Sequence, residues 1–166
     1  MNKTFKKLTL GELCDRLFEY RQPLILMHTR PDGDTVGSAM ALSLIYKSMG
    51  RAARCLCADK IPQRLSFLCE GMPPCLSGET LAGCEYDGIV SIDIGAAGQI
   101  GRIGEGTLGV DLMIDHHSKG EPFADNYVDT AAAAAGEIVF DIAEELRRRG
   151  ALEKIDIETA KRIYAA

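Results

Sequence analysis

The chain is 166 residues long, about the size of one domain, and its 46% hydrophobic and 26% charged residues are ordinary for a globular protein of mixed helices and strands. Its net charge of −5 argues against a broad basic face for long nucleic acid, because such binding depends on phosphate neutralisation by Lys and Arg. The sequence shows no signal peptide and no apolar run of transmembrane length, so we expect a cytoplasmic protein with no membrane partner.

The first fifty residues predict two helices around one buried strand. Apolar residues recur at helical spacing over residues 10–21, and Pro23 ends that helix. Residues 24–27 form an unbroken apolar run, which suits a strand buried on both faces. A polar loop, residues 28–34, then precedes a helix expected over residues 36–48.

The middle of the chain predicts three further strands. Residues 53–58 are expected to form the first of them, and Pro62 is expected to open a short helix that ends near residue 69. Residues 71–83 are rich in Gly and Pro and indicate a loop. Apolar runs then predict strands at residues 88–92 and 110–114.

The last third predicts a short strand and a long helix. Residues 123–128 are a candidate strand, and Asp129 or Thr130 is expected to cap the helix that follows. Arg147–Arg149 lie in its last turn, where cations complement the helix dipole. The inner face of this helix is expected to be Ala135, Ile138, Val139, Ile142 and Leu146.

A final helix is expected to begin after the cap residue Asp156. Its expected apolar face is Ile157, Ala160, Ile163 and Tyr164. Strands that alternate with helices predict an α/β fold, a single domain with a doubly wound, mainly parallel sheet and helices on both faces. The cysteines predict reduced, mostly buried thiols, with a zinc site as the second reading. They are Cys14, Cys55, Cys57, Cys69, Cys75 and Cys84.

All three histidines and four of the aspartates follow predicted strands. They are His28, Asp32, Asp34, Asp93, Asp115, His116 and His117. In an open parallel sheet the carboxyl ends of neighbouring strands meet at one edge, so we expect these side chains to converge there. One such residue alone is more often a cap or a turn residue, but the whole set predicts a functional site.

The first of these segments, residues 28–34, places two carboxylates on either side of a glycine. Gly33 can adopt backbone angles that other residues avoid, so Asp32 and Asp34 can face two adjacent metal ions. We expect His28 to share the first ion. Taken alone, the same stretch of sequence reads as a simple turn.

The four residues after this loop, Thr35 to Ser38, read as the N-terminus of a helix. Free backbone N–H groups and the helix dipole favour a phosphate there, so Gly37 and Ser38 are candidate contacts of a substrate phosphate. Gly37 is equally compatible with close packing of the helix on the sheet.

Two further segments supply candidate ligands. Asp93 closes a predicted strand, where it can bridge two metals or simply cap a loop, and His116 and His117 follow Asp115 at the end of another strand. Imidazole and carboxylate ligands together suit manganese, with magnesium or another divalent metal as substitutes. Two such ions, roughly 3.5–4 Å apart, would turn a bridging water into hydroxide, so no Ser or Cys nucleophile is needed.

These segments resemble the motifs of the DHH phosphoesterase family, and the resemblance covers nearly the whole chain. Residues 28–38 resemble the first motif, Asp93 the second, and Asp115-His116-His117 the third. The branch that the chain resembles most trims very short RNA and removes phosphate from 3′,5′-phosphoadenosine (pAp), the nano-RNase/pAp-phosphatase type. The resemblance implies a manganese-dependent phosphoesterase with a short RNA or nucleotide as its partner, and it leaves a homodimer open.

The resemblance also implies a role for each residue. Two manganese ions would be held, one by His28, Asp32 and Asp93 and the other by Asp34, Asp93 and His116. His117 would contact the scissile phosphate, and Asp115 would orient a histidine. Arg30 stands where Asn is usual in the family, and the Ala131–Ala135 run stands where Ser or Thr is frequent, so neither is given a role.

Full members of the family continue past a segment like residues 160–166 into a strand with another metal-binding Asp and a C-terminal substrate-binding domain. The last predicted helix has no C-cap signal. We therefore expect residues 1–166 to be a catalytic domain truncated before those parts and weakly active alone.

Other functions stay open at this stage. The same core would serve a cyclic-dinucleotide phosphodiesterase, or a hydrolase that resembles exopolyphosphatases or pyrophosphatases. A non-catalytic nucleotide- or metal-binding module would use the same cleft. The least favoured alternative is a flavodoxin-like or receiver-like domain whose strand-end acids are accidental.

Overall fold

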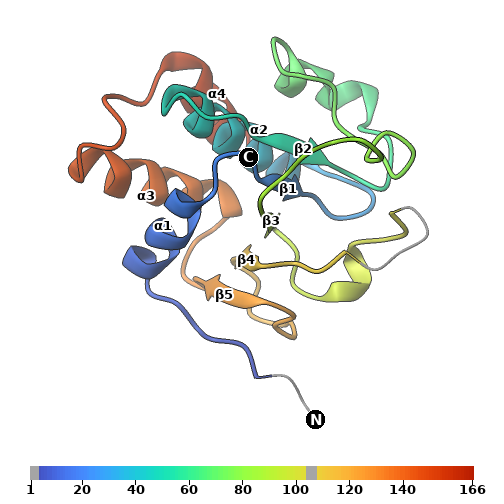
Figure 1. Ribbon diagram of the computed structural model, residues 1–166, viewed down its shortest axis with the longest axis horizontal. Coiled ribbons are helices and arrows are strands. Elements are labelled where there is room, and N and C mark those ends of the chain that lie inside the picture. The colour runs from blue at the N-terminus through green and yellow to red at the C-terminus, as the bar shows by residue number, and fades with distance from the viewer. Residues whose placement is uncertain (1–3, 104–107) are drawn as a thin grey trace.

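The computed structural model describes residues 4–103 and 108–166, arranged around a five-stranded sheet (Figure 1). In chain order the elements are α1 (Leu10–Glu19), β1 (Leu24–Leu26), α2 (Gly33–Ser48), β2 (Arg54–Leu56), the 3-10 helix η1 (Gln63–Cys69), β3 (Ile89–Ile92), the 3-10 helix η2 (Ala97–Gln99), β4 (Leu112–Asp115), β5 (Asp125–Val128), α3 (Ala135–Arg148) and α4 (Ile157–Ala165). The predicted α/β class is confirmed.

The sheet has the strand order β2-β1-β3-β4-β5, and each neighbouring pair is parallel. From β1 the chain passes through α2 to the edge strand β2, and then returns to the other side of β1 to form β3. The boundary between β1 and β3 is therefore the topological switch point. In open α/β sheets, ligands bind in the crevice outside the carboxyl ends of the strands at this point.

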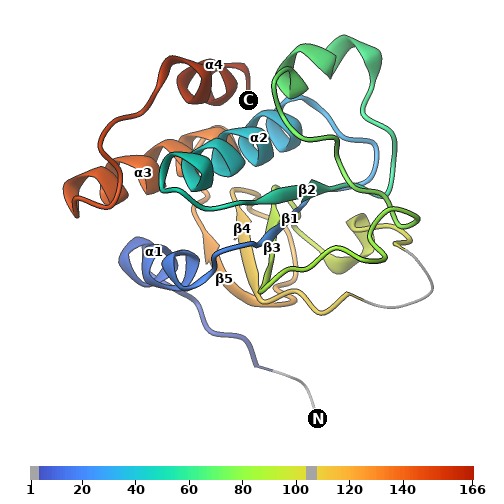
Figure 2. The same cartoon turned by 45° about the horizontal axis from the view of Figure 1, so that its top comes forward.

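One face of the sheet carries the larger apolar cluster. It is covered by the first three α-helices, which contribute buried side chains such as Leu13, Met40 and Ile142. Figure 2 shows α4 above α2, on the side away from the sheet. The other face is covered by connecting segments, with Leu76 and Ile103 among their buried residues. Within the described part of the chain, no helix combines the length and the apolar character needed to cross a membrane.

Helix α2 begins earlier than the sequence predicts, at Gly33 instead of Val36. Asp32 is its N-cap, and the Asp32 Oδ1 atom accepts a hydrogen bond from the Thr35 N–H at 3.2 Å. The predicted loop therefore ends inside the first motif. The helix is buried on almost every side because it lies between the sheet and α4.

Helix α3 confirms the predicted inner face but not the predicted cap. Its N-cap is Ala134, which offers no side-chain acceptor, and Asp129 instead accepts from the Ala131 N–H in the preceding turn at 2.9 Å. The first two N–H groups of α3, those of Ala135 and Gly136, donate to Asp34 from another part of the chain. Sequence position alone could not reveal a cap supplied from that distance.

Helix α4 is capped by Asp156, as predicted, but of its expected apolar face only Ile163 packs against the main apolar cluster. Ile157 and Tyr164 are 69% and 94% exposed, whereas Thr159 and Arg162 are buried. The buried Arg162 guanidinium donates to the carbonyl oxygens of Leu68 and Glu70, at 3.1 and 2.7 Å. Charged hydrogen bonds to these two carbonyls fix the orientation of the helix, which an apolar pattern does not encode.

Candidate metal centre

The predicted site residues come together at the carboxyl edge of three adjacent strands. His28 lies just beyond β1, Asp93 just beyond β3, and Asp115 is the last residue of β4. His116 and His117 follow directly, while Asp32 and Asp34 belong to the N-terminus of α2. The parallel arrangement of β1, β3 and β4 is what brings these distant segments to one place.

A first group of ligand atoms is formed by His28, Asp32 and Asp93. The Nε2 atom of His28 lies 3.4 Å from Asp93 Oδ2 and 3.7 Å from Asp32 Oδ1. One ligand atom from each of the three residues lies within 4.8 Å of the other two, which is compact enough to hold one metal ion. This is the first ligand set that the sequence suggested.

A second group surrounds the other oxygen of the same aspartate. The Nε2 atom of His116 lies 3.6 Å from Asp93 Oδ1 and 3.4 Å from Asp34 Oδ2. His117 also approaches, with Nδ1 at 3.6 Å from Asp93 Oδ1, so Asp93, His116 and His117 form the second compact set. Asp93 therefore belongs to both groups, one oxygen to each.

Asp93 combines a buried carboxylate with a left-handed backbone conformation. Its carboxylate is buried, and within the described residues Oδ1 has no hydrogen-bond partner. Its backbone has φ of 58°, in the left-handed region that Asp tolerates better than most residues but that still costs energy. A buried oxygen that lacks a partner is costly unless something else binds it.

The donor set of this centre fits a pair of divalent cations. The Oδ1 atom of Asp93, which has no hydrogen-bond donor among the residues described, lies near the imidazole of His116. A metal ion bound to this oxygen would take the place of the missing donor. Nitrogen and oxygen ligands in this mixture suit manganese and other first-row divalent metals. The residues of this chain therefore fit the metal that the sequence suggested.

Asp32 and Asp34 each cap a helix as well as facing the centre. Asp34 accepts from the N–H groups of Ala135 and Gly136, at 2.9 and 3.1 Å, and from the Ser38 hydroxyl at 3.0 Å. It thus caps α3 from the N-terminus of α2 while it faces His116. Its position is set by backbone N–H groups, so it is preorganised to bind a cation.

His117 is oriented by Asp115. The Nδ1 atom of His117 and the Oδ1 atom of the buried Asp115 are 2.7 Å apart, and this hydrogen bond raises the pKa of His117 above its usual value. If Nδ1 carries the proton for this bond, it has no lone pair for a metal, and only Nε2 is available. Asp34 is therefore better suited than His117 to join His116 as a ligand.

His28 carries the largest change in acidity at the centre. Its hydrogen bond with Asp93 raises its pKa to about 9, aided by the Thr29 carbonyl oxygen, which lies 2.7 Å from Nδ1. Burial raises the pKa of Asp93 as well. A metal ion must displace the proton on His28 before it binds there.

Two of the predicted substrate contacts lie inside the fold. Gly37 and Ser38 are both buried, and they lie in the second turn of α2 instead of at its exposed start. A Cβ atom on Gly37 would lie 2.8 Å from the Arg162 carbonyl oxygen, so this glycine allows close packing against α4. The Ser38 hydroxyl donates to Asp34 and so supports a candidate metal ligand.

Sequence reasoning missed Gln99 at the end of η2. Its side-chain Oε1 accepts from the N–H groups of Gly95 and Ala96, at 2.8 and 3.0 Å. Its backbone carbonyl accepts from the Thr29 N–H at 2.8 Å. Gln99 therefore connects the loop after Asp93 to the loop that begins at His28. Its spacing carries no signal, because a glutamine in a glycine-rich loop matches no motif.

A family model described as "DHH family, N-terminal domain" matches residues 22–166. Among solved structures, the chain is similar to an exopolyphosphatase-related protein from Bacteroides fragilis, with 23% sequence identity and a TM-score of 0.74. The match covers 95% of this chain and 48% of that protein, so the chain spans about half the length of this relative. At this identity the likeness shows the fold.

Proposed function

The chain belongs to the DHH family, as the N-terminal domain of that family, and we propose that it is the metal-binding catalytic domain of a phosphoesterase. The observation that carries the proposal is the buried carboxylate of Asp93, whose two oxygens face two overlapping groups of ligand atoms. An aspartate shared in this way is suited to bridge two cations. Two-cation sites are common in enzymes that hydrolyse phosphate esters.

Each ion would have its own set of side chains. His28 and Asp32 would hold one ion with Asp93, and His116 and Asp34 would hold the other. Two bound manganese ions, or magnesium in their place, would supply an activated water and neutralise charge that develops on the phosphate. His117 would act on the substrate directly, and Asp115 would act through His117.

His117 is the residue positioned to donate a proton to the substrate. Its Nδ1 is engaged by Asp115, and its side chain is 45% exposed, so Nε2 can reach a bound phosphate ester. The Asp115 carboxylate raises the pKa of His117 and so favours the protonated ring. A protonated Nε2 would donate to a phosphate oxygen or to the leaving oxygen, while Asp115 holds the ring in position.

The substrates that we propose are short oligoribonucleotides and pAp. Support comes from the resemblance of residues 28–38, Asp93 and Asp115-His116-His117 to the nano-RNase/pAp-phosphatase type. The net charge of −5 also favours a small anion over long nucleic acid. The description of the Bacteroides fragilis protein supports a second candidate, hydrolysis of polyphosphate or pyrophosphate by the same centre.

A substrate panel tests these proposals. The protein is incubated with manganese and with pAp, dinucleotides, cyclic dinucleotides, polyphosphate or pyrophosphate, and the products are quantified by mass spectrometry. Release of phosphate from pAp and mononucleotides from dinucleotides, both lost in Asp93→Asn, supports the first proposal. Preferred hydrolysis of polyphosphate supports the second. Manganese binding with no turnover of any substrate would favour a non-catalytic module.

A further inference from the structure

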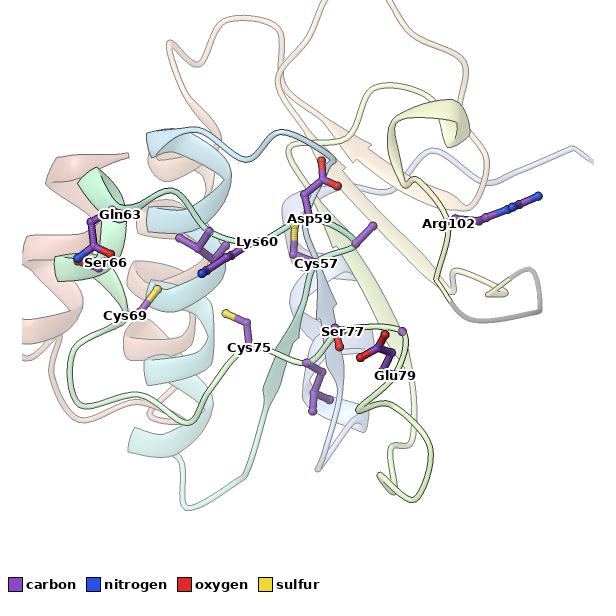
Figure 3. Close-up of a pocket in the computed structure, with 14 residues that line it drawn as sticks. Cys57, Asp59, Lys60, Gln63, Ser66, Cys69, Cys75, Ser77, Glu79 and Arg102 are labelled. Carbon is purple, nitrogen blue, oxygen red and sulfur yellow. The ribbon is translucent and has the colours of Figure 1, made fainter.

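A pocket of about 830 Å³ lies beside the metal centre and is lined by three thiols. Its wall includes Cys57, whose thiol donates to the His28 carbonyl oxygen at 3.4 Å, and Asp59, which accepts from the Arg30 N–H at 2.8 Å. Figure 3 shows that the sulfur atoms of Cys69 and Cys75 point toward one another at this pocket. Both residues are half-buried and free.

Cys69 is fixed in place from the side of α4. The buried Arg162 donates to the carbonyl oxygens of Leu68 and Glu70, which are the two residues on either side of Cys69. Leu68 itself is 2% exposed and belongs to the main apolar cluster. The backbone that carries the Cys69 thiol therefore has little freedom to move away from the pocket.

Cys75 is fixed in place from the side of the sheet. The next residue, Leu76, forms a parallel bridge with Leu56 of β2. The Leu76 N–H donates to the Cys55 carbonyl oxygen at 2.8 Å, and the Cys57 N–H donates to the Leu76 carbonyl oxygen at 3.2 Å. Pro73 and Pro74 further restrict the chain just before it. These two sets of hydrogen bonds hold the thiols so that their sulfur atoms face one another at the pocket.

Each thiol shifts the pKa of the other. A hydrogen bond from Cys75 lowers the pKa of Cys69 to about 7, against the effect of burial and with help from the positive charge of Arg162. The same contact and burial raise the pKa of Cys75. The pair therefore favours one thiolate beside one protonated thiol, the arrangement that thiol oxidation requires.

We propose that Cys69 and Cys75 form a redox-modification site, which hydrogen peroxide or a related hydroperoxide converts into an intramolecular disulfide. The assignment rests on the facing sulfur atoms and on the hydrogen bonds that hold each segment in place, and it is independent of the phosphoesterase activity. Cys14 and Cys55 are buried away from solvent and are unsuited to such a reaction. The disulfide would close a small loop through residues 70–74 and join η1 to the segment that pairs with β2.

The reaction has two balanced steps. The Cys69 thiolate attacks one peroxide oxygen, the O–O bond breaks, and the products are a sulfenic acid and hydroxide. The Cys75 sulfur then attacks the sulfenic sulfur, the S–O bond breaks, and the hydroxyl group leaves with the Cys75 proton as water. The two thiols together lose two electrons, which the hydroperoxide accepts.

Peptide mapping tests the proposal. The protein is treated with hydrogen peroxide and then denatured in the presence of an alkylating agent, which blocks the remaining free thiols. Trypsin and a Glu-specific protease then cut the chain after Arg64, Glu70 and Glu79. These cuts place Cys69 and Cys75 in separate peptides. We expect the two peptides to stay joined until a reductant is added. Separate peptides, or a bond from Cys69 to a different cysteine, would overturn the proposal.

Three variants make the result specific. In Cys75→Ala the joined peptide should be absent, and Cys69 should instead be trapped as a sulfenic acid by a dimedone-type probe. Alkylation of Cys69 at pH 7 should also slow by about tenfold, because its thiolate loses the Cys75 hydrogen bond. Cys69→Ala should give neither product, and Cys84→Ala, at another half-buried thiol, should behave as the wild type. Equal alkylation of Cys69 in wild type and Cys75→Ala would contradict the proposed contact.

Discussion

The carboxylate of Asp34 accepts a hydrogen bond from the backbone N–H of Ala135 at 2.9 Å, although the two residues are 101 positions apart in the chain. Through this bond, a candidate metal ligand on α2 also caps α3. The same carboxylate faces His116 Nε2 at 3.4 Å. Assembly of the metal centre and docking of α3 are therefore linked in one side chain.

Replacement of Asp34 should separate these two roles. Asp34→Asn keeps an acceptor for the α3 N–H groups but loses the charge, so manganese affinity should fall with little change in the free energy of unfolding. Asp34→Ala should lower manganese affinity and also cost about 1 kcal/mol of stability, because the cap is lost. Calorimetric titration and urea unfolding measure the two effects. Asp156→Ala, which removes the cap of α4, is the matched control and should cost stability alone.

We expect Asp93 to be needed for the binding of both ions and Asp32 for the binding of one. Asp93→Asn keeps a residue that tolerates the left-handed backbone but removes the oxygen pair that the two groups share, so manganese binding at both sites should be lost. Asp32→Asn should remove one ion and leave the second. Binding stoichiometry by calorimetry or electron paramagnetic resonance distinguishes them. Two ions retained in Asp93→Asn would rule out the bridging role.

The pair formed by His117 and Asp115 predicts a pH effect of definite sign. The pKa of His117 in the folded protein lies above its ordinary value of 6.5, so the stabilisation from this pair is complete below pH 6.5 and is lost as pH rises through the raised pKa. In Asp115→Asn the pKa of His117 should fall, and the proton should leave at lower pH. A nuclear magnetic resonance titration of the imidazole measures this directly. An unchanged pKa would show that Asp115 does not act on His117.

We expect Gln99 to hold the loop after Asp93 and the loop after β1 in place without binding a metal itself. Gln99→Ala removes the acceptor for Gly95 and Ala96, so the loop after Asp93 should loosen and manganese affinity should fall by roughly tenfold. The control is Gln63→Ala, at an exposed glutamine distant from these loops in sequence, which should bind manganese as the wild type does. Equal affinity in both variants would leave Gln99 a structural residue only.

Much of the site could be predicted from the sequence because strand-end residues in a parallel sheet share one edge. The apolar runs placed β1, β3 and β4 within two residues of their observed positions, so the polar residues after them were assigned to the right edge. The same reasoning did not predict the burial of Gly37 and Ser38, because it treated the start of α2 as exposed. Burial of that helix under α4 comes from packing that no local pattern specifies.

The sequence by itself determined the α/β class, the order of the elements and the set of side chains that gather at the strand ends. These follow from short-range rules, such as the periodicity of apolar residues and the sites of caps and turns. Only the tertiary structure decided that Asp34 caps α3, that Arg162 is buried on α4, and that the sulfur atoms of Cys69 and Cys75 face one another. Each of these depends on hydrogen bonds between segments distant along the chain, and such bonds exist only after the fold has brought the segments together.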